Sequence, residues 1–287
     1  MTQMKKFAVL GHPVAHSLSP KMHAANFASI GFDGSYEKFD VAPENLHSFV
    51  LSKRDEGYSG LNITVPHKIA VIPLLDRKDE SVVRYGACNT IKFEADGTLT
   101  GYNTDVIGFV DGLAAHGFSI RGKRVVIIGC GGAGSALATC AAYEGAASLK
   151  VADLRAESVG NLVEKIGSLG LGVAVEGLKV LDGTASDAQK AVWGEAAAEA
   201  DLVVNATPMG LHPGEPSALP DSAFHPGQFV LDIVPTKEFP PTAAAAVKAG
   251  ATATDGLEFL VGQGAKSFEI WTGLRADRNA MLAAIRG

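Results

Sequence analysis

A glycine-rich turn is the first part of the sequence whose residue types and spacing could do chemistry. It follows the apolar run 125–128 directly and has the pattern G-x-G-x-x-G. In a dinucleotide-binding turn the first glycine permits a tight bend, the second lets backbone amides approach a pyrophosphate, and the third lets the next helix pack closely on the strand. The residues that would hold the cofactor here are Gly129, Gly131, Gly132, Ala133 and Gly134. The alternative is a packing turn without a ligand.

An acidic residue favours the dinucleotide interpretation. Asp153 ends the next strand-like run, 149–153, at roughly the 20-residue distance expected after the glycines. A carboxylate there accepts hydrogen bonds from the adenosine ribose of NAD and repels the additional phosphate of NADP. We therefore expect NAD, with NADP as the alternative. Arg155 could stack on adenine, hold that phosphate, or be only a solvated charge at the start of a helix.

Polar side chains also gather where apolar runs of the first hundred residues end. The segments concerned are 17–20, 62–68, 87–90 and 101–105. Each segment also has a purely structural explanation. Ser19 could cap a helix, Asn89 could be a turn residue, and Asp105 could cap a helix beginning near 104. His67 is expected to be a solvent-facing turn residue.

The elements that must position these residues alternate between strand and helix. We expect strands at 7–10, 36–41, 61–65, 90–93, 99–102, 124–128, 149–153, 202–205 and 229–234. We expect helices at 19–30, 44–56, 104–116, 157–166, 242–249, 257–272 and 277–285, and one from the glycine turn to about 144. Asp96–Gly97 predicts a hairpin between two of the strands. The alternation predicts an α/β fold with a parallel, doubly wound sheet.

Composition narrows the possible functions. A length of 287 residues allows about two domains, and a net charge of −6 disfavours nucleic acid and anionic membranes as partners. Cys88, Cys130 and Cys140 fit neither a disulfide framework nor a zinc site, a usage that suits a reducing cytoplasm. His12 and His16 have a proline between them, so we expect no metal. The chain is expected to be a cytoplasmic enzyme that oxidises or reduces a small polar substrate.

Taken together, these segments resemble the shikimate dehydrogenase family over nearly the whole chain. The motifs are S-x-S-P from Ser17, N-x-T-x-P-x-K from Asn62, A-x-N-T from Ala87, G-x-N-T-D from Gly101, G-x-G-G-A-G from Gly129, N-A-T-P-M-G from Asn205, and Asp255–Gly256 followed by Gln263. The resemblance implies an N-terminal α/β substrate domain, 1–104 plus 255–287. It also implies a doubly wound Rossmann-type domain that binds NAD(P), 105–254.

The resemblance also assigns roles to single residues. Ser17 and Ser19 match the serines that hold the substrate carboxylate, and Lys68 and Asp105 match the catalytic pair. Thr207 matches a cofactor-binding position. The residues that match ligands of the ring hydroxyls and the carboxylate end are Asn62, Thr64, Asn89 and Gln263.

The implied reaction is the reversible reduction of 3-dehydroshikimate to shikimate. Hydride arriving at a ketone leaves charge on oxygen, which Lys68 can neutralise with a proton while Asp105 orients it. No metal is required, because the nicotinamide carries the electrons. Alternatives are a quinate or amino-shikimate dehydrogenase on the same scaffold, or a ligand-sensing homologue without turnover, which would not need the Lys68–Asp105 pair. The enzyme would be a monomer or a homodimer.

Two positions depart from the family pattern. Pro235 stands in a segment where members often have an aromatic residue, and Phe259 stands where a methionine is usual. Both positions lie near the nicotinamide in the family. With Asp153 they suggest a divergent or NAD-using branch.

Overall fold

Two compact units make up the fold. The structure, a computed structural model, describes residues 4–287 other than 213, 235 and 237. One unit combines the described part of Met1–Phe109 with Leu260–Gly287, and the other is Val110–Phe259. Two helices, α5 (Thr104–Ala115) and α10 (Gly256–Thr272), each begin in one unit and end in the other. No helix among the described residues is long and apolar enough to cross a membrane.

The first unit is built on a mixed sheet in the order β2-β1-β3-β5-β6-β4. The strands are β1 (Lys5–Gly11), β2 (Gly34–Asp40), β3 (Gly60–Ile63), β4 (Arg77–Lys78), β5 (Thr90–Phe93) and β6 (Leu99–Tyr102). Strand β1 runs parallel to β2 and β3, whereas β5 is antiparallel to β3 and β6. The predicted β5–β6 hairpin is confirmed, and Gly97 adopts the positive φ of 83° that such a turn favours.

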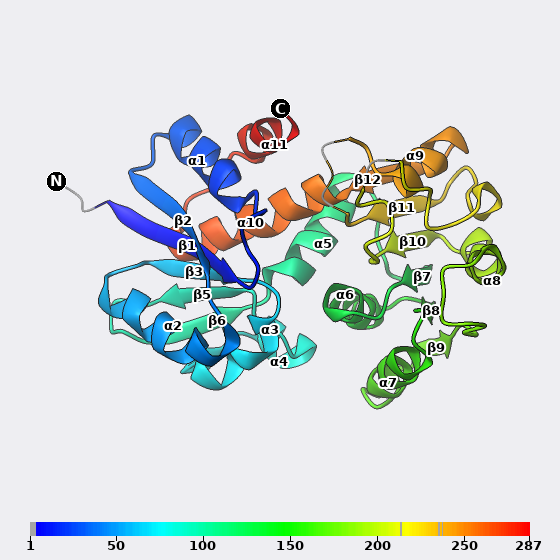
Figure 1. The fold of residues 1–287 in the computed structure, drawn as a ribbon, viewed down its shortest axis with the longest axis horizontal. Helices are drawn as coiled ribbons and strands as arrows, with labels where there is room; N and C mark the ends of the chain where they lie inside the picture. The colour runs from blue at the N-terminus through cyan, green and yellow to red at the C-terminus, as the bar shows by residue number, and fades with distance from the viewer. Residues whose placement is uncertain (1–3, 213, 235, 237) are drawn as a thin grey trace. The chain divides into compact units, whose positions relative to one another are not determined.

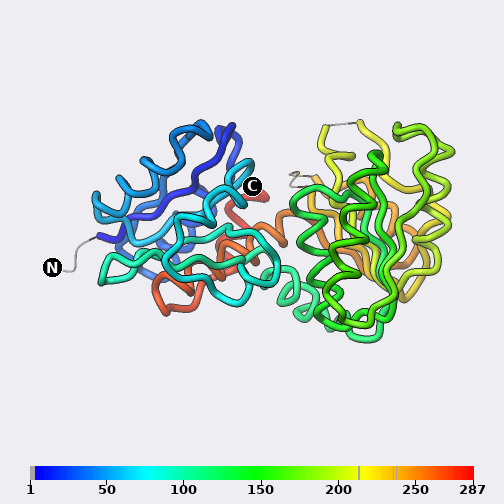
Figure 2. Tube along the Cα trace, turned by 90° about the horizontal axis from the view of Figure 1, so that it is seen from below, coloured from blue at the N-terminus to red at the C-terminus, as the bar shows by residue number. Residues whose placement is uncertain are grey.

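Helices cover both faces of this sheet. They are α1 (Ser19–Ile30), α2 (Leu46–Asp55), α3 (His67–Ala70), α4 (Glu80–Tyr85), α11 (Arg278–Arg286) and α10 from Leu260 onward. Because strand side chains alternate, Phe7 packs with aromatic residues of α1 and α10, while Ala8 and Leu10 face the core that contains Leu46 and Val50 of α2. In Figure 2 the orange and red C-terminal helices of this unit lie beside its blue N-terminal segments.

The start of α1 differs from its prediction. Its N-cap is Leu18 and makes no side-chain capping bond, while Ser19 and Pro20 lie inside the first turn. The prediction that Ser19 caps the helix is therefore wrong. The backbone amide of Ser19 instead donates to Ser17 Oγ at 3.3 Å, so a neighbouring serine supplies the acceptor. The predicted stop at Gly31 is confirmed by its positive φ of 65°.

The second unit contains a sheet whose neighbouring strands are all parallel, in the order β12-β11-β10-β7-β8-β9. The strands are β7 (Arg124–Ile128), β8 (Ser148–Ala152), β9 (Ala174–Gly177), β10 (Leu202–Asn205), β11 (Phe229–Asp232) and β12 (Thr252–Asp255). Counted from β7, this is the strand order 3-2-1-4-5-6 read from the other edge. The predicted doubly wound Rossmann-type domain is confirmed.

Among its described residues, the second unit contains four complete α-helices. They are α6 (Gly132–Tyr143), α7 (Ala156–Gly167), α8 (Asp187–Ala198) and α9 (Pro241–Lys248). Helices α6 and α8 lie on opposite sides of β7 (Figure 1). Trp193 of α8 is completely buried among Val126, Val203 and Val230, one from each of three neighbouring strands. This packing attaches α8 to the middle of the sheet.

Candidate active site

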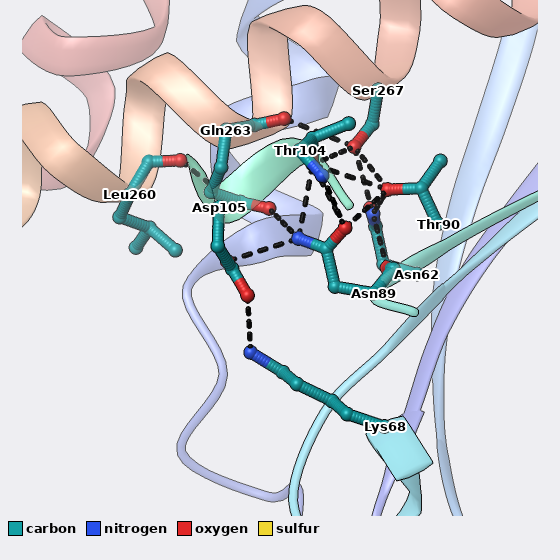
Figure 3. Close-up of polar contacts among 9 residues, drawn as sticks. All are labelled: Asn62, Lys68, Asn89, Thr90, Thr104, Asp105, Leu260, Gln263 and Ser267. Carbon is teal, nitrogen blue, oxygen red and sulfur yellow. Dashed lines mark hydrogen bonds and ion pairs between the residues drawn. The ribbon is translucent and has the colours of Figure 1, made fainter. Parts of the chain in front are cut away.

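Lys68 and Asp105 form an ion pair in the first unit. Lys68 lies in α3, just after β3, and Asp105 lies in the first turn of α5, just after β6. Lys68 Nζ donates to Asp105 Oδ2 at 2.7 Å (Figure 3), and the two side chains are 28% and 14% exposed. The pair is thus shielded from bulk solvent but still open to a small ligand. An ammonium in this position can supply a proton, and the carboxylate can hold it in place.

Asn89 holds the other oxygen of Asp105. Its Nδ2 donates to Asp105 Oδ1 at 2.9 Å, while its Oδ1 accepts from the backbone amide of Thr104 at 2.7 Å. A backbone N–H can only donate, so Oδ1 must face Thr104 and Nδ2 must face Asp105. Asn89 was predicted to bind the substrate. The structure places its amide against the acidic member of the ion pair.

Asn62 and Gln263 complete the polar cluster around Asn89. Asn62 is 6% exposed; its Oδ1 accepts from the Tyr36 hydroxyl at 2.7 Å and its Nδ2 donates to Ser267 Oγ at 2.9 Å. Gln263 is 8% exposed; its Oε1 lies 3.4 Å from Asn89 Nδ2 and its Nε2 donates to Leu260 O at 2.8 Å. The predicted residues Asn62, Asn89 and Gln263 therefore meet in one cluster.

The predicted carboxylate ligands lie close to this cluster. Ser17 is half-buried, and Ser19 is buried and hydrogen-bonds to the Tyr36 hydroxyl, which in turn donates to Asn62. Burial raises the pKa of Tyr36 above its ordinary value, so its hydroxyl stays protonated and can donate. Thr64 follows β3 and is half-buried, and its backbone amide donates to Leu10 O.

Several residues of the cluster were not singled out from the sequence. They are Tyr36, Thr90, Thr104 and Ser267. Ser267 could have been found, because it lies four residues after Gln263 and shares its face of α10. Tyr36 carries no such signal, because it lies on β2 and reaches Asn62 of β3 across the intervening strand β1.

His67 was predicted to be an exposed turn residue, and that prediction is wrong. Its side chain is completely buried, and its Nε2 lies 2.7 Å from Val41 O. The reason is that the short helix α3 packs its first residue against the end of β2. His67 thereby fixes the start of the helix that carries Lys68.

The glycine turn of the second unit has the shape that a pyrophosphate requires. Gly129 has a φ of 103°, and a side chain at Gly134 would begin 1.8 Å from Gly129 O, so neither position accepts another residue. At Gly131 and Gly132 a Cβ would meet open space, and α6 begins there without a side-chain cap. The free amides and partial positive charge of the helix N-terminus suit a phosphate group.

Asp153 follows β8 beside this turn. Its Oδ2 accepts from the backbone amide of Cys130 at 2.8 Å, and its Oδ1 accepts from the backbone amide of Arg155 at 3.0 Å. The Asp153 side chain is 13% exposed, whereas that of Arg155 is 69% exposed, with its Nε 3.4 Å from Asp153 Oδ1. Arg155 is also the N-cap residue of α7. The carboxylate is therefore held rigidly at the edge of the turn.

Thr207 lies on the turn after β10. Its hydroxyl donates to Asn205 Oδ1 at 2.7 Å and accepts from the Met209 amide at 3.2 Å. A side chain at Gly129 would begin 2.6 Å from Ala206 O, so this turn and the glycine turn touch.

Phe259 is half-buried in α10. The departure at Pro235 lies outside the described residues. Among the described residues, no group of three or more His, Cys, Asp or Glu side chains could hold a metal ion.

Asp232 is a buried acid at the end of β11. Its Oδ1 accepts from Asn205 Nδ2 and from the Val234 amide, both at 3.1 Å. Burial nevertheless outweighs these hydrogen bonds and raises the pKa of Asp232 from 3.8 to about 6. The protonated form is therefore favoured by folding, and its stabilisation is present at acidic pH and lost as the pH rises through about 6.

We expect Asp232→Asn to remove this pH dependence, because the amide keeps an oxygen for both donors but does not ionise. The free energy of unfolding of the variant, relative to the natural chain, should rise by about 2–3 kcal/mol between pH 4 and 7. Urea unfolding at several pH values measures this difference. Asp221→Asn is the control, because Asp221 is exposed. Its free energy of unfolding, plotted against pH, should run parallel to that of the natural chain. A parallel curve for Asp232→Asn would show that the buried carboxyl does not titrate in this range.

Comparisons with known proteins agree with this geometry. Residues 9–91 match the model of the shikimate dehydrogenase substrate binding domain, and residues 256–286 match that of the shikimate 5′-dehydrogenase C-terminal domain. The chain is 40% identical over 280 residues to shikimate dehydrogenase (NADP(+)) of Moorella thermoacetica, covering 97% of this chain and 92% of that protein.

Solved structures are similar over the same length. Shikimate 5-dehydrogenase of Thermus thermophilus, in complex with NADP(H) and shikimate, has a TM-score of 0.83 at 35% identity and covers 99% of both chains. Quinate dehydrogenase of Corynebacterium glutamicum, in complex with NAD, has a TM-score of 0.85 at 31% identity and covers 98% of both chains. The identity and coverage of these matches confirm the resemblance found in the sequence: the chain belongs to the shikimate dehydrogenase family.

Proposed function

We propose that this protein is a nicotinamide-dependent oxidoreductase that interconverts shikimate and 3-dehydroshikimate. The observation that carries the proposal is the ion pair between Lys68 Nζ and Asp105 Oδ2, at 2.7 Å and partly shielded from solvent. The family membership supports the substrate, because relatives that match the whole chain are named for shikimate.

The chain's own residues account for the proton that accompanies hydride transfer. The nicotinamide supplies or accepts the hydride when it is bound. In the direction of reduction, Lys68 donates a proton from Nζ to the carbonyl oxygen of the substrate and regains one from solvent. In the direction of oxidation, Lys68 accepts the hydroxyl proton. Asp105 keeps Nζ in place in both directions, and Asn89 holds the second oxygen of Asp105.

Substrate binding is proposed to use the polar groups of the first unit. Ser17 and Ser19 would donate to the substrate carboxylate, Ser19 by turning its hydrogen from the Tyr36 hydroxyl toward the substrate. Thr64, which lies between Asn62 and Lys68 on the same segment, would contact a ring hydroxyl. Asn62 and Gln263 already bind protein groups, so we propose that they contact the ring through remaining lone pairs of their amide oxygens. Asn89 is proposed to contact the ring by exchanging a threonine partner for a ring hydroxyl.

The cofactor is proposed to bind the second unit, with NAD preferred over NADP. The phosphates would lie over Gly131, Gly132 and Ala133, where backbone amides are free of side chains. Asp153 supports NAD, because its carboxylate is held beside the turn and would accept from a ribose hydroxyl. Several relatives are named as NADP(+) enzymes, so this preference would set the chain apart from them.

A quinate dehydrogenase is the second candidate. The observation that favours it is the combination of Asp153 with the similarity to a quinate dehydrogenase that binds NAD. A ligand sensor without turnover is disfavoured, because sensing needs no proton donor and the Lys68–Asp105 pair is intact.

Steady-state kinetics with shikimate and quinate, each with NAD⁺ and NADP⁺, tests the proposal. We expect the highest kcat/KM with shikimate and NAD⁺. A higher value with quinate would make quinate the substrate. Binding of shikimate without turnover of either acid would overturn the enzyme assignment in favour of a sensor.

The serine pair can be tested separately. Replacing Ser17 and Ser19 together by alanine should raise KM for shikimate about tenfold or more, because each lost hydroxyl removes a hydrogen bond to a charged group. The Kd for NAD should not change. The double variant also loses the acceptor that Ser17 Oγ provides for the Ser19 amide at the start of α1, so its Tm is measured alongside. Exposed Ser168, replaced by alanine, is the control. An unchanged KM in the folded double variant would return both serines to a structural role.

A further inference from the structure

Ser267 joins α10 to three polar segments of the first unit. Its side chain is completely buried. Its Oγ lies 2.9 Å from Asn62 Nδ2, 2.8 Å from Thr90 Oγ1 and 3.0 Å from Thr104 Oγ1 (Figure 3). It also lies 3.0 Å from Gln263 O, one turn earlier on the same helix. A single hydroxyl thus touches residues near the end of β3, at the start of β5 and at the start of α5.

The direction of these hydrogen bonds follows from what each group can do. The Gln263 carbonyl only accepts, so the hydrogen of Ser267 points to it. Ser267 Oγ then has two lone pairs, and Asn62 Nδ2, which only donates, takes one of them. The second accepts from one threonine hydroxyl, either Thr90 or Thr104.

The remaining donors are satisfied by Asn89. The threonine hydroxyl that does not donate to Ser267 can donate to Asn89 Oδ1, which lies 3.1 Å from both. Asn89 Oδ1 already accepts from the Thr104 amide, so both of its lone pairs are then filled. The two hydrogens of Asn89 Nδ2 point to Asp105 Oδ1 at 2.9 Å and Thr104 Oγ1 at 3.0 Å. Ser267 supplies the shortest acceptor contact to Asn62 Nδ2 and to each threonine hydroxyl. Without it, Asn62 Nδ2 has only Thr90 Oγ1 at 3.1 Å and Asn89 O at 3.2 Å, and the two threonine hydroxyls have only each other at 3.2 Å and Asn89 Oδ1 at 3.1 Å.

We propose that Ser267 is a positioning residue for the catalytic pair, acting through Thr90, Thr104 and Asn89 on the carboxylate of Asp105; its catalytic consequence rests on the proposed function. Without the Ser267 hydroxyl, Asn62 Nδ2 and one threonine hydroxyl lose their shortest acceptor contact in a buried site and depend on the longer contacts to Thr90, Thr104 and Asn89. That threonine then competes for Asn89 Oδ1. The Asn89 amide shifts, and its hold on Asp105 Oδ1 weakens.

Ser267→Ala is expected to lower kcat about tenfold, the effect of weakening one hydrogen bond to a charged group. KM for the cofactor should stay unchanged. The acid limb of the kcat–pH profile should move to higher pH, because a carboxylate with fewer donors is protonated more easily. Adding Ser267→Ala to Asp105→Asn should lower kcat little further, since Ser267 acts through Asp105. Ser267→Cys keeps the volume but is a weak acceptor, so it should resemble Ser267→Ala and is the second variant if alanine impairs folding.

Thr272→Val is the matched control, because Thr272 lies on the same helix and its hydroxyl makes the same bond to the carbonyl four residues earlier, at Phe268. A second readout does not need turnover: the ¹³C resonance of the Asp105 carboxyl, assigned with Asp105→Asn, should titrate at higher pH in both Ser267 variants and be unmoved in Thr272→Val. If the natural chain lacks turnover, the proposed function fails while this titration still tests the link. The role of Ser267 would be overturned if the Asp105 titration did not move. It would also be overturned if kcat fell only in proportion to the fraction of folded protein while the pH profile stayed unchanged.

Discussion

Replacing Lys68 by alanine is expected to lower kcat by about 10²–10⁴-fold, the range for a positioned acid–base group. The reason is that Lys68 Nζ is the cation held by Asp105 at 2.7 Å, and water would have to deliver the proton without it. The Kd for the cofactor should change little, because Lys68 lies in the first unit and the glycine turn in the second. Single-turnover and steady-state rates, with cofactor binding measured separately, check this result.

Asp105→Asn should also lower kcat, since the amide leaves Lys68 without its counter-charge. The loss of kcat in the Lys68→Ala/Asp105→Asn double variant should be much smaller than the product of the two single losses, because the two residues act as one unit. Lys92→Ala is the matched control: Lys92 forms an ion pair with Glu94 in the same unit and is 30% exposed, close to the 28% of Lys68. Near-normal turnover in Lys68→Ala would disprove the proposed mechanism.

The second large effect is expected in the choice of cofactor. The Asp153 carboxylate is held by two backbone amides beside the glycine turn, so it cannot swing away from a 2′-phosphate. Two like charges at about 4 Å repel by roughly 1 kcal/mol in water and roughly 4 kcal/mol near a protein surface. The lost ribose hydrogen bonds add about 1 kcal/mol. We therefore expect kcat/KM for NAD⁺ to exceed that for NADP⁺ by about 10–1,000-fold. Exposed Arg155 favours the lower part of this range, because it could turn toward a phosphate.

The Asp153→Asn variant tests whether the cofactor preference comes from the charge of Asp153 or from the shape of the glycine turn. Asparagine keeps an oxygen for the Cys130 amide, so the turn should retain its shape while the charge is lost. The variant should use NAD⁺ less well and discriminate less against NADP⁺. Asp201→Asn is the control. Asp201 also lies in the second unit, and it also accepts from a backbone amide and from a guanidinium, both belonging to Arg124. The preference would be refuted if the natural chain had a kcat/KM for NADP⁺ equal to or higher than that for NAD⁺ at the same shikimate concentration.

Local patterns predicted most of the fold because local interactions determine it. Alternating apolar residues and Asp96–Gly97 predicted β5, β6 and their antiparallel pairing, and the run 124–128 predicted β7. The elements that were missed lack such signals. The short strands β9 and β12 contain few apolar residues, and α8 buries Trp193 together with small alanines, so its buried face is hard to recognise in sequence.

The sequence by itself determined the family, the order of the elements, and which residues had to meet: Lys68 with Asp105, and the glycine turn with Asp153. The glycine turn and Asp153 follow from motif spacing, whereas the family and the Lys68–Asp105 pair follow from the resemblance that several motifs in the same order carry. Only the tertiary structure decided what each side chain touches. Asn89 faces Asp105, His67 is buried against Val41, Leu18 rather than Ser19 caps α1, and Ser267 completes the network. The physical reason is that a hydrogen bond depends on atoms brought together by residues far apart in the chain, such as 62 and 267, and no local pattern records that distance.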